Sequence, residues 1–258
     1  MQKVWPMSFA FRFGMVVWAC AVFAQTPALA GQVTVAVASN FTLPMRDIVA
    51  AFEQETGHEV TLVSGSTGAL YAQIVNGAPF DVLLAADAAR PQALVDAGLA
   101  AASDRKTYAI GRLVFWTRDT GLPLSDASVI ALQGQSQRLA IANPKLAPYG
   151  RAAVEVLDRL GVRAGLGRQL VVGQNVNQSY QFVRTGNARY GFVAASLVYR
   201  DGVLEHGSAW LVPVSWHTPV RQDAVLLRGT DDAPRALFGY LGTASAAAVL
   251  KRFGYGVP

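Results

Sequence analysis

The sequence predicts an α/β protein with two lobes, each a mostly parallel sheet flanked by helices. A strand–helix alternation occurs near the N-terminus and again after residue 137, as in parallel sheets. Two long segments of alternating apolar residues, 106–118 and 220–229, separate these two sets and are predicted to be strands that cross between the lobes. Because no low-complexity linker divides the chain, the crossover segments are expected to form the hinge, near Gly111 and near residues 221–223.

The first set contains three strands and three helices. Residues 32–39 alternate and are rich in valine, which predicts a strand. Residues 43–57 place Met45, Ile48 and Phe52 on one face of a helix that ends at Gly57. The remaining elements are a strand at 58–65, a short helix at 69–77, a buried strand at 80–87 and a helix at 89–99.

The second set repeats this order without a strict internal repeat. Strands are predicted at 137–144, 168–173 and 190–196, and helices at 150–161 and 176–186; a last helix at 233–254 closes the chain after the second crossover strand. We therefore expect residues 1–30 to be a leader, residues 31–110 with 222–258 to form lobe 1, and residues 111–221 to form lobe 2.

The first 30 residues have the composition of a secretory signal peptide. Lys3 and Arg12 are their only charges, and the apolar run 13–24 is too short to span a bilayer comfortably. Small residues ending at Ala30 complete the pattern and predict cleavage after that residue. An N-terminal membrane anchor is the alternative, and a lipoprotein signal at Cys20 is less favoured because bulky Trp18 precedes it.

The composition restricts the class of protein. Hydrophobic residues make up 52% and charged residues 15% of the chain, which suits a packed globular protein. Cleavage would remove the single cysteine, so the mature chain could form no disulfide. It would also lower the net charge from +5 to +3 by removing two positive charges. With no cluster of Lys and Arg among aromatic residues, a nucleic-acid partner is not expected.

Neutral hydrogen-bonding residues follow the predicted strands, at the edge where open α/β sheets bind ligands. They include Ser39-Asn40, Ser64 to Gly68, Asn143-Pro144, Pro148 to Gly150, Gly173 to Val176 and Ala194 to Ser196. Hydroxyls and free backbone N–H groups at helix starts can converge on an oxyanion, and glycine allows the backbone to approach it closely. At any single position, the alternative is that the side chain only caps a helix.

Enzyme signatures are weak. Ser66 lies outside a nucleophile elbow, and no phosphate-binding loop or dinucleotide fingerprint occurs. The three histidines are isolated, follow no metal-ligand spacing and are expected on surfaces or loops. Asp81 and Asp87 flank a strand as a carboxylate pair would, although capping or turn roles are favoured. We therefore expect neither a catalyst nor a cation site.

Several motifs resemble the periplasmic molybdate-binding protein of ABC transporters. They are "TVAVASNFTLPMRDIVAAFEQETGHEVTLVSGSTGALYAQIVNGAPFDVLLAAD", "LAIANPKLAPYGRAAVEVLDRLG", "GQNVNQSYQFVRTGNARYGFVAAS" and "LKRFGY", which cover nearly all of the mature chain in order. The resemblance implies a type II periplasmic binding protein fold that closes over molybdate or tungstate. It further implies a carrier without a cofactor, free in the periplasm, monomeric, that docks on an ABC permease in the inner membrane.

The resemblance also implies the anion-binding residues. The matching positions are Ser39, Asn40, Ser66, Thr67, Tyr149 and Val176. Ser66 or Thr67 would supply a hydroxyl, and the last two would bind through backbone amides. Some relatives have a tyrosine where this chain has Ala194, so that side-chain contact is missing here.

Three other functions remain open at this point. The same fold could carry another tetrahedral oxyanion such as sulfate or phosphate. An exported hydrolase could use Ser66 or Ser39, although no pattern supplies its base. A sensor or adhesion module would bind no small ligand at all.

Overall fold

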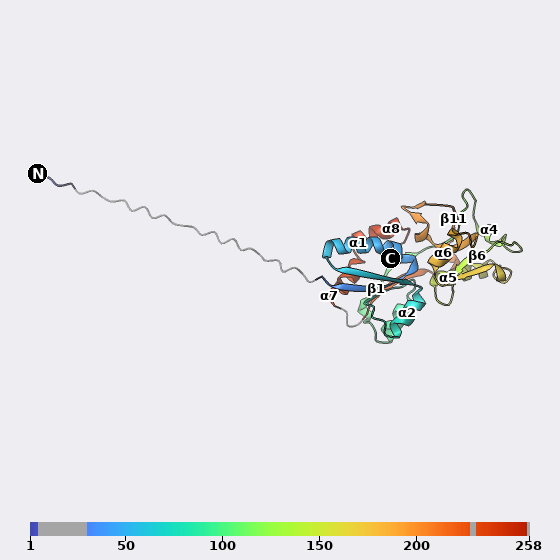
Figure 1. Cartoon of the computed structure of the whole chain (residues 1–258), viewed down its shortest axis with the longest axis horizontal. Helices are drawn as coiled ribbons and strands as arrows, with labels where there is room; N and C mark the ends of the chain where they lie inside the picture. The colour runs from blue at the N-terminus through green and yellow to red at the C-terminus, as the bar shows by residue number, and fades with distance from the viewer. Residues whose placement is uncertain (5–29, 228–230, 257–258) are drawn as a thin grey trace.

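The computed structural model describes residues 1–4, 30–227 and 231–256, and it has two lobes that lie side by side (Figure 1). Each lobe has one five-stranded sheet with helices packed on it, so the predicted two-lobed α/β fold is confirmed. Nearly all of the predicted signal peptide lies outside the described residues. Within the described ranges, no helix is both long and apolar enough to cross a membrane.

The sheet of lobe 1 has the strand order β2-β1-β3-β12-β4. Its strands are β1 (Gln32–Ala38), β2 (Glu59–Gly65), β3 (Val82–Leu84), β4 (Arg105–Gly111) and β12 (Val220–Leu226). β1 pairs in parallel with β2 and β3, whereas β12 is antiparallel to β3 and to β4. Four strands therefore run one way and β12 runs against them.

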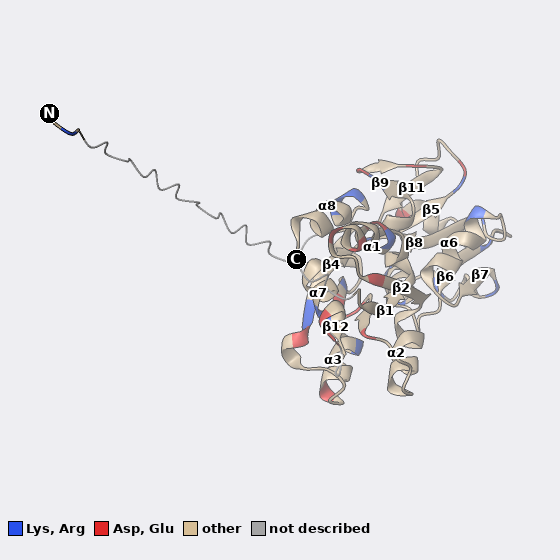
Figure 2. Ribbon diagram, turned by 60° about the vertical axis from the view of Figure 1, so that its left-hand side comes forward, with Lys and Arg blue, Asp and Glu red and all other residues tan. Residues whose placement is uncertain are grey.

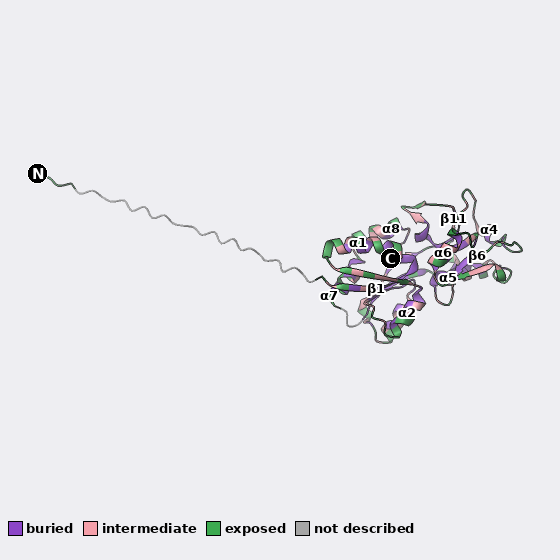
Figure 3. Cartoon of the chain, viewed as in Figure 1, coloured by how far each residue is buried: buried purple, intermediate pink, exposed green. Residues whose placement is uncertain are grey.

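Helices cover both faces of this sheet because β1 alternates between two cores. Val33, Val35 and Val37 belong to one core, and Ala36 belongs to the other. In Figure 3, α1 and α2 carry both buried and exposed residues, as helices packed on a sheet do. The helices of lobe 1 are α1 (Thr42–Thr56), α2 (Thr67–Val75), α3 (Ala89–Asp96), α7 (Asp232–Tyr240) and α8 (Ala244–Arg252), with the 3₁₀ turns η1 (Ser39–Phe41) and η2 (Ala102–Asp104). The predicted stop at Gly57 is confirmed: this glycine has φ 75° and donates its N–H to Glu53.

The sheet of lobe 2 has the order β11-β5-β8-β6-β7. Its strands are β5 (Leu113–Thr117), β6 (Leu139–Ala142), β7 (Leu170–Gly173), β8 (Tyr190–Ala194) and β11 (Ser208–Leu211), and a separate hairpin joins β9 (Tyr199–Arg200) to β10 (Val203–Leu204). The helical elements are α4 (Asp126–Ile130), α5 (Pro148–Arg159), α6 (Val176–Arg184), η3 (Gly167–Gln169), η4 (Ala195–Leu197) and η5 (Val214–Trp216).

The two sheets share one topology. β6, β7 and β8 pair as β1, β2 and β3 do, with β6 in the place of β1 between its two parallel neighbours. β5 is the single reversed strand, as β12 is in lobe 1. Equivalent helices follow equivalent strands: α1 and α2 follow β1 and β2, and α5 and α6 follow β6 and β7. Both lobes can therefore present helix N-termini to the region between them.

Two predicted elements differ from the structure. Residues 106–118 were expected as one strand, but β4 ends at Gly111 and β5 begins at Leu113, in different sheets. The apolar alternation continues through the crossing at Arg112, so the pattern alone does not reveal it. The C-terminal helix is also divided, because Gly242 follows α7 and the Thr243 hydroxyl caps α8 at the N–H of Ala246.

The chain crosses between the sheets at Arg112 and returns along residues 212–219. Residues 221–223, where the second hinge is predicted, lie within β12. The pairing of β12 with β4 shifts register between Gln222 and Asp223, which is a local irregularity in the strand. The lobe boundaries and the hinge remain predictions.

Candidate functional site

The six residues predicted to bind an anion meet in one small cavity between the lobes. Ser39, Asn40, Ser66, Thr67, Tyr149 and Val176 all line it. None of them is more than 6% exposed. The cavity volume is about 180 Å³, including the part open to solvent. The volume open to the centre of a water molecule is only about 10 Å³, far below the roughly 300–1,000 Å³ of sites for drug-sized ligands, so the cavity leaves room for no more than a compact ligand.

Lobe 1 contributes two hydroxyls at the start of α2. Ser66 occupies the N-cap position with extended backbone, but its side chain makes no capping bond. The capping alternative is therefore wrong for Ser66. The Oγ1 atom of Thr67 accepts the N–H of Ala86 at 2.9 Å, which fixes the oxygen and leaves the hydroxyl proton available for donation.

The turn after β1 is held by buried hydrogen bonds. The Nδ2 atom of Asn40 donates to Gln222 Oε1 at 2.8 Å and to the Tyr255 hydroxyl at 2.9 Å. The backbone carbonyl of Asn40 accepts the Ser196 hydroxyl at 2.8 Å. Both amide protons of Asn40 are thus committed, so this residue can donate to a ligand through its backbone N–H alone. Ser39, 5% exposed, keeps its hydroxyl beside this fixed turn.

Lobe 2 contributes the first turns of two helices. Pro148 starts α5 at a position that needs no N–H, and the preceding Ala147 has no side chain able to cap the helix. In α6, Asn175 caps the N–H of Gln178 at 3.0 Å. Within the described part of the chain, the N–H groups of Tyr149 and Val176 have no hydrogen-bond partner. These two groups can bind an anion, as predicted from the resemblance.

No Lys, Arg, Asp or Glu lines the cavity. In the view of Figure 2, basic and acidic residues are scattered over both lobes and form no band. Burial raises the pKa of Tyr149 well above its usual value, and it does the same for Tyr255, so both hydroxyls stay neutral. The Tyr149 hydroxyl packs against Gly111, where a Cβ would lie 2.2 Å from it. The site is therefore a set of fixed, uncharged donors.

Other candidate residues have structural roles. The Ser64 hydroxyl pairs with Thr42 Oγ1 at 2.7 Å, so it is engaged outside the cavity. The predicted capping role of Asp87 is confirmed by its bond from the N–H of Arg90 at 3.0 Å. Asp81 accepts the N–H of Thr34 at 2.7 Å. His217 lies in a loop, as expected, but is buried.

Residues that support the turn were not identified from sequence as partners. Ser196 follows β8 and was expected to face the ligand, but its hydroxyl bonds to Asn40 and accepts from Tyr255 at 3.0 Å. Gln222 and Tyr255 come from the other end of the chain, and no local signal links them to the turn. Ala194 is buried in β8 and does not line the cavity. Within the described residues, no three His, Cys, Asp or Glu side chains gather as metal ligands.

Comparison with known proteins identifies the family. Residues 33–256 match the model of the bacterial extracellular solute-binding proteins. The chain is 49% identical over 232 residues to molybdate-binding protein ModA of Azotobacter vinelandii, with 89% of this chain and 92% of that protein covered. This chain belongs to the molybdate-binding ModA family of bacterial extracellular solute-binding proteins.

Further comparisons agree with the ModA family. Molybdate-binding protein ModA of Rhodobacter capsulatus is 44% identical over 246 residues, with 95% of this chain and 96% of that protein covered. The solved structure of the Azotobacter vinelandii periplasmic molybdate-binding protein superposes with a TM-score of 0.82 and 36% identity, over 88% of this chain and 99% of that one. The chain therefore matches nearly the whole length of both ModA proteins and the fold of the Azotobacter vinelandii protein.

Proposed function

We propose that this protein captures molybdate between its two lobes and delivers it to an ABC permease as the extracytoplasmic solute-binding component. The observation that carries the proposal is the buried cavity, which is lined from both lobes by neutral donors and by no charged side chain. The two ModA relatives are molybdate-binding proteins, which supports the same ligand. Tungstate has the same shape and charge and is proposed as a second ligand.

The donors would come from both sides of the anion. We assign hydroxyl contacts to Ser39 and Thr67, and backbone N–H contacts to Asn40, Tyr149 and Val176. Thr67 is favoured over Ser66 as the main hydroxyl, because its oxygen is already oriented by Ala86 while its proton is free. A dianion taken out of water needs several such bonds to replace its hydration.

Closure follows from the same geometry. An open form would offer the anion the donors of one lobe at a time, whereas the closed form offers both. Molybdate therefore binds the closed form more tightly and shifts the equilibrium toward it. We propose that the hinge lies at the crossing near Gly111 and near residues 221–223 at the start of β12, between lobe 1 (31–110 with 222–258) and lobe 2 (111–221).

Selectivity is expected to have two sources. Hydrogen phosphate carries a proton that needs an acceptor, and fixed N–H and O–H donors supply little acceptor capacity. Sulfate has the charge and shape of molybdate but is smaller, so the size of the cavity must discriminate against it. Comparing the affinities for these anions therefore decides between a molybdate carrier and a carrier of sulfate or phosphate.

The proposed setting is a monomer in the periplasm, exported by a signal peptide that is cut after Ala30. The family is one of solute-binding proteins, which fits a carrier and not a catalyst. The hydrolase alternative needs a base beside Ser39 or Ser66, and the lining of the cavity contains no His, Lys, Asp or Glu.

Calorimetric titration of residues 31–258 with molybdate, tungstate, sulfate and phosphate tests the proposal. We expect tight one-to-one binding of molybdate and tungstate and far weaker binding of sulfate and phosphate. Tight binding of sulfate or phosphate would show that the ligand is that anion and not molybdate, while the carrier role would stand. Absence of binding by all four anions would refute the assignment of the cavity.

A further inference from the structure

Helix α2 of lobe 1 touches lobe 2 through its backbone. The N–H of Gly68 donates to the carbonyl of Leu146 at 2.9 Å. A Cβ at Gly68 would lie 3.0 Å from that oxygen and 3.1 Å from Arg90 Nη2. Only glycine, with no side chain, lets the two backbones come this close without displacement.

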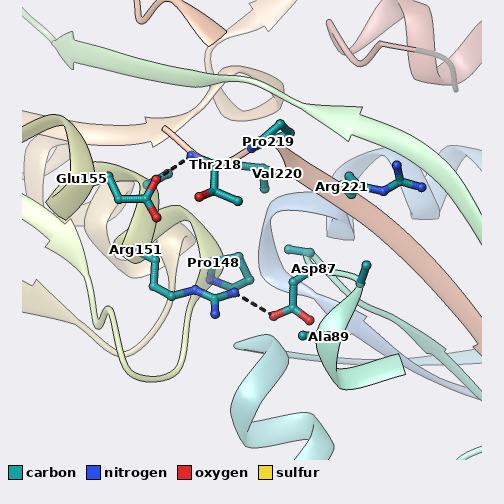
Figure 4. A pocket seen from close by; sticks show the side chains of 12 residues that line it. Asp87, Ala89, Pro148, Arg151, Glu155, Thr218, Pro219, Val220 and Arg221 are labelled. Carbon is teal, nitrogen blue, oxygen red and sulfur yellow. Dashed lines mark hydrogen bonds and ion pairs between the residues drawn. The ribbon is translucent and has the colours of Figure 1, made fainter. Parts of the chain in front are cut away.

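Asp87 links the lobes at the next point along the interface. Its Oδ2 atom accepts Arg90 Nη1 from its own lobe at 2.5 Å and Arg151 Nη2 from α5 of lobe 2 at 3.2 Å, the latter drawn in Figure 4. The Asp87 side chain is 9% exposed, and that of Arg151 is 46% exposed. Arg90 Nη2 also donates to the Lys145 carbonyl at 3.2 Å. One buried carboxylate thus forms ion pairs with an arginine from each lobe.

These contacts lie immediately beside the anion cavity. Gly68 follows Thr67 in α2, and Asp87 follows Ala86, whose N–H holds the Thr67 hydroxyl. On the other side, Tyr149 lies between Leu146 and Arg151 in sequence. The segments that would hold the anion are therefore the segments that meet across the interface.

We propose that these contacts form a clasp that holds the closed form and sets the rate at which the anion is released, an inference that rests on the proposed function. The clasp consists of Gly68, Asp87 and Arg90 in lobe 1 and Lys145, Leu146 and Arg151 in lobe 2. Asp87 and Arg90 pair within lobe 1, so their half of the clasp persists when the lobes separate. When the lobes close, Lys145, Leu146 and Arg151 of lobe 2 come into contact with these lobe 1 residues.

The clasp differs from the anion contacts in what it controls. It is absent from the open form, so it should slow opening and leave the encounter of anion with open protein nearly unaffected. It also spans the lobes without contributing to either core, so its loss should spare the folding of the ligand-free protein. The half-exposed ion pair of Arg151 is further expected to weaken in salt.

Two variants of residues 31–258 test the clasp. Gly68→Ala adds the Cβ that would press on Leu146, and Arg151→Gln removes the charge from a largely exposed side chain. Gly239→Ala is the control for the first, because a Cβ there meets nothing within 4 Å in α7. Arg163→Gln is the control for the second, because its ion pair with Asp158 lies within lobe 2. Release of radiolabelled molybdate into excess unlabelled molybdate gives the rate.

We expect both clasp variants to release molybdate about three- to tenfold faster, the effect of one hydrogen bond or one half-exposed ion pair. Association rates should stay within about twofold, and the ligand-free melting temperatures should not fall, since alanine favours a helix more than glycine does. Added salt should speed release from the wild type more than from Arg151→Gln, and Arg151→Lys should restore part of the slow release.

Unchanged release in both clasp variants would overturn the proposal. So would an equal acceleration in the Gly239→Ala and Arg163→Gln controls, because the effect would then not belong to the interface. Failure of the proposed function is distinguishable, since the wild-type protein would then bind no molybdate in the first place.

Discussion

Replacing Thr67 by valine separates the two tasks of one hydroxyl. The side chain is 1% exposed and lines the cavity, and its Oγ1 atom accepts the N–H of Ala86 at 2.9 Å. Valine fills almost the same volume with a methyl group in place of the hydroxyl. In Thr67→Val the anion loses a donor, and the N–H of Ala86 loses its acceptor.

Each loss has its own magnitude. A hydrogen bond to a charged group contributes about 1.5–3 kcal/mol, which corresponds to a Kd about 10- to 150-fold higher. An unsatisfied buried N–H costs about 1–3 kcal/mol, which should lower the free energy of unfolding of the ligand-free protein. Calorimetric titration with molybdate measures the first quantity, and urea unfolding without ligand measures the second.

Matched variants decide whether the hydroxyl is responsible. Thr67→Ser keeps the oxygen and should remain within about threefold of wild-type affinity, since both functions of the hydroxyl survive. Ser66→Ala should weaken binding less than Thr67→Val does, because the Ser66 hydroxyl has no orienting partner of the kind that Ala86 gives Thr67. Wild-type affinity in Thr67→Val, together with a large loss in Ser66→Ala, would refute the assignment.

Three further predictions concern the surroundings of the cavity. Gly111→Ala should lower the free energy of unfolding in urea by about 1–3 kcal/mol and weaken molybdate binding, because its Cβ would lie 2.2 Å from the buried Tyr149 hydroxyl. Equal losses in the control Gly239→Ala would contradict this explanation. Burial raises the pKa of Tyr149 and Tyr255, so their contribution to the free energy of unfolding is complete below about pH 10. Above that pH the free energy of unfolding should fall by about 1.4 kcal/mol per pH unit for each buried tyrosine. Tyr255→Phe should reduce this slope in urea unfolding at several pH values, and an unchanged slope would show that Tyr255 does not contribute to it. Molybdate affinity should be constant from about pH 6 to 9 by calorimetry, because the cavity has no lining group that titrates there, and a marked decline would indicate a titrating contact.

Much of the fold could be predicted because its signals are local. The valine alternation of residues 32–39 predicted β1, and α1 ends before Gly57 as expected. The six cavity residues could be named because they stand after strands, at helix starts. Parallel strands bring those positions to one edge, and the matching topology of the two sheets brings both edges to the same cavity.

What could not be predicted depends on contacts between distant parts of the chain. The apolar pattern of residues 106–118 is the same on both sides of Arg112, so it does not show that the two halves join different sheets. Whether Ser66 caps α2 or faces a ligand depends on a side-chain orientation that sequence does not encode. Ser196 was expected at the ligand but bonds to Asn40, which belongs to the other lobe.

A carrier must release what it binds, and the structure suggests how uncharged donors allow this. A buried arginine or lysine would keep its attraction for the dianion when the lobes part, because a charge acts over a longer range than a hydrogen bond. N–H and O–H donors act only at contact, and here Thr67 and Tyr149 come from different lobes. Separation of the lobes by a few ångströms would therefore remove half of the donors at once. Arg90 and Arg151 are both held by Asp87, so in the proposed clasp their charge strengthens the contact between the lobes and is withheld from the anion.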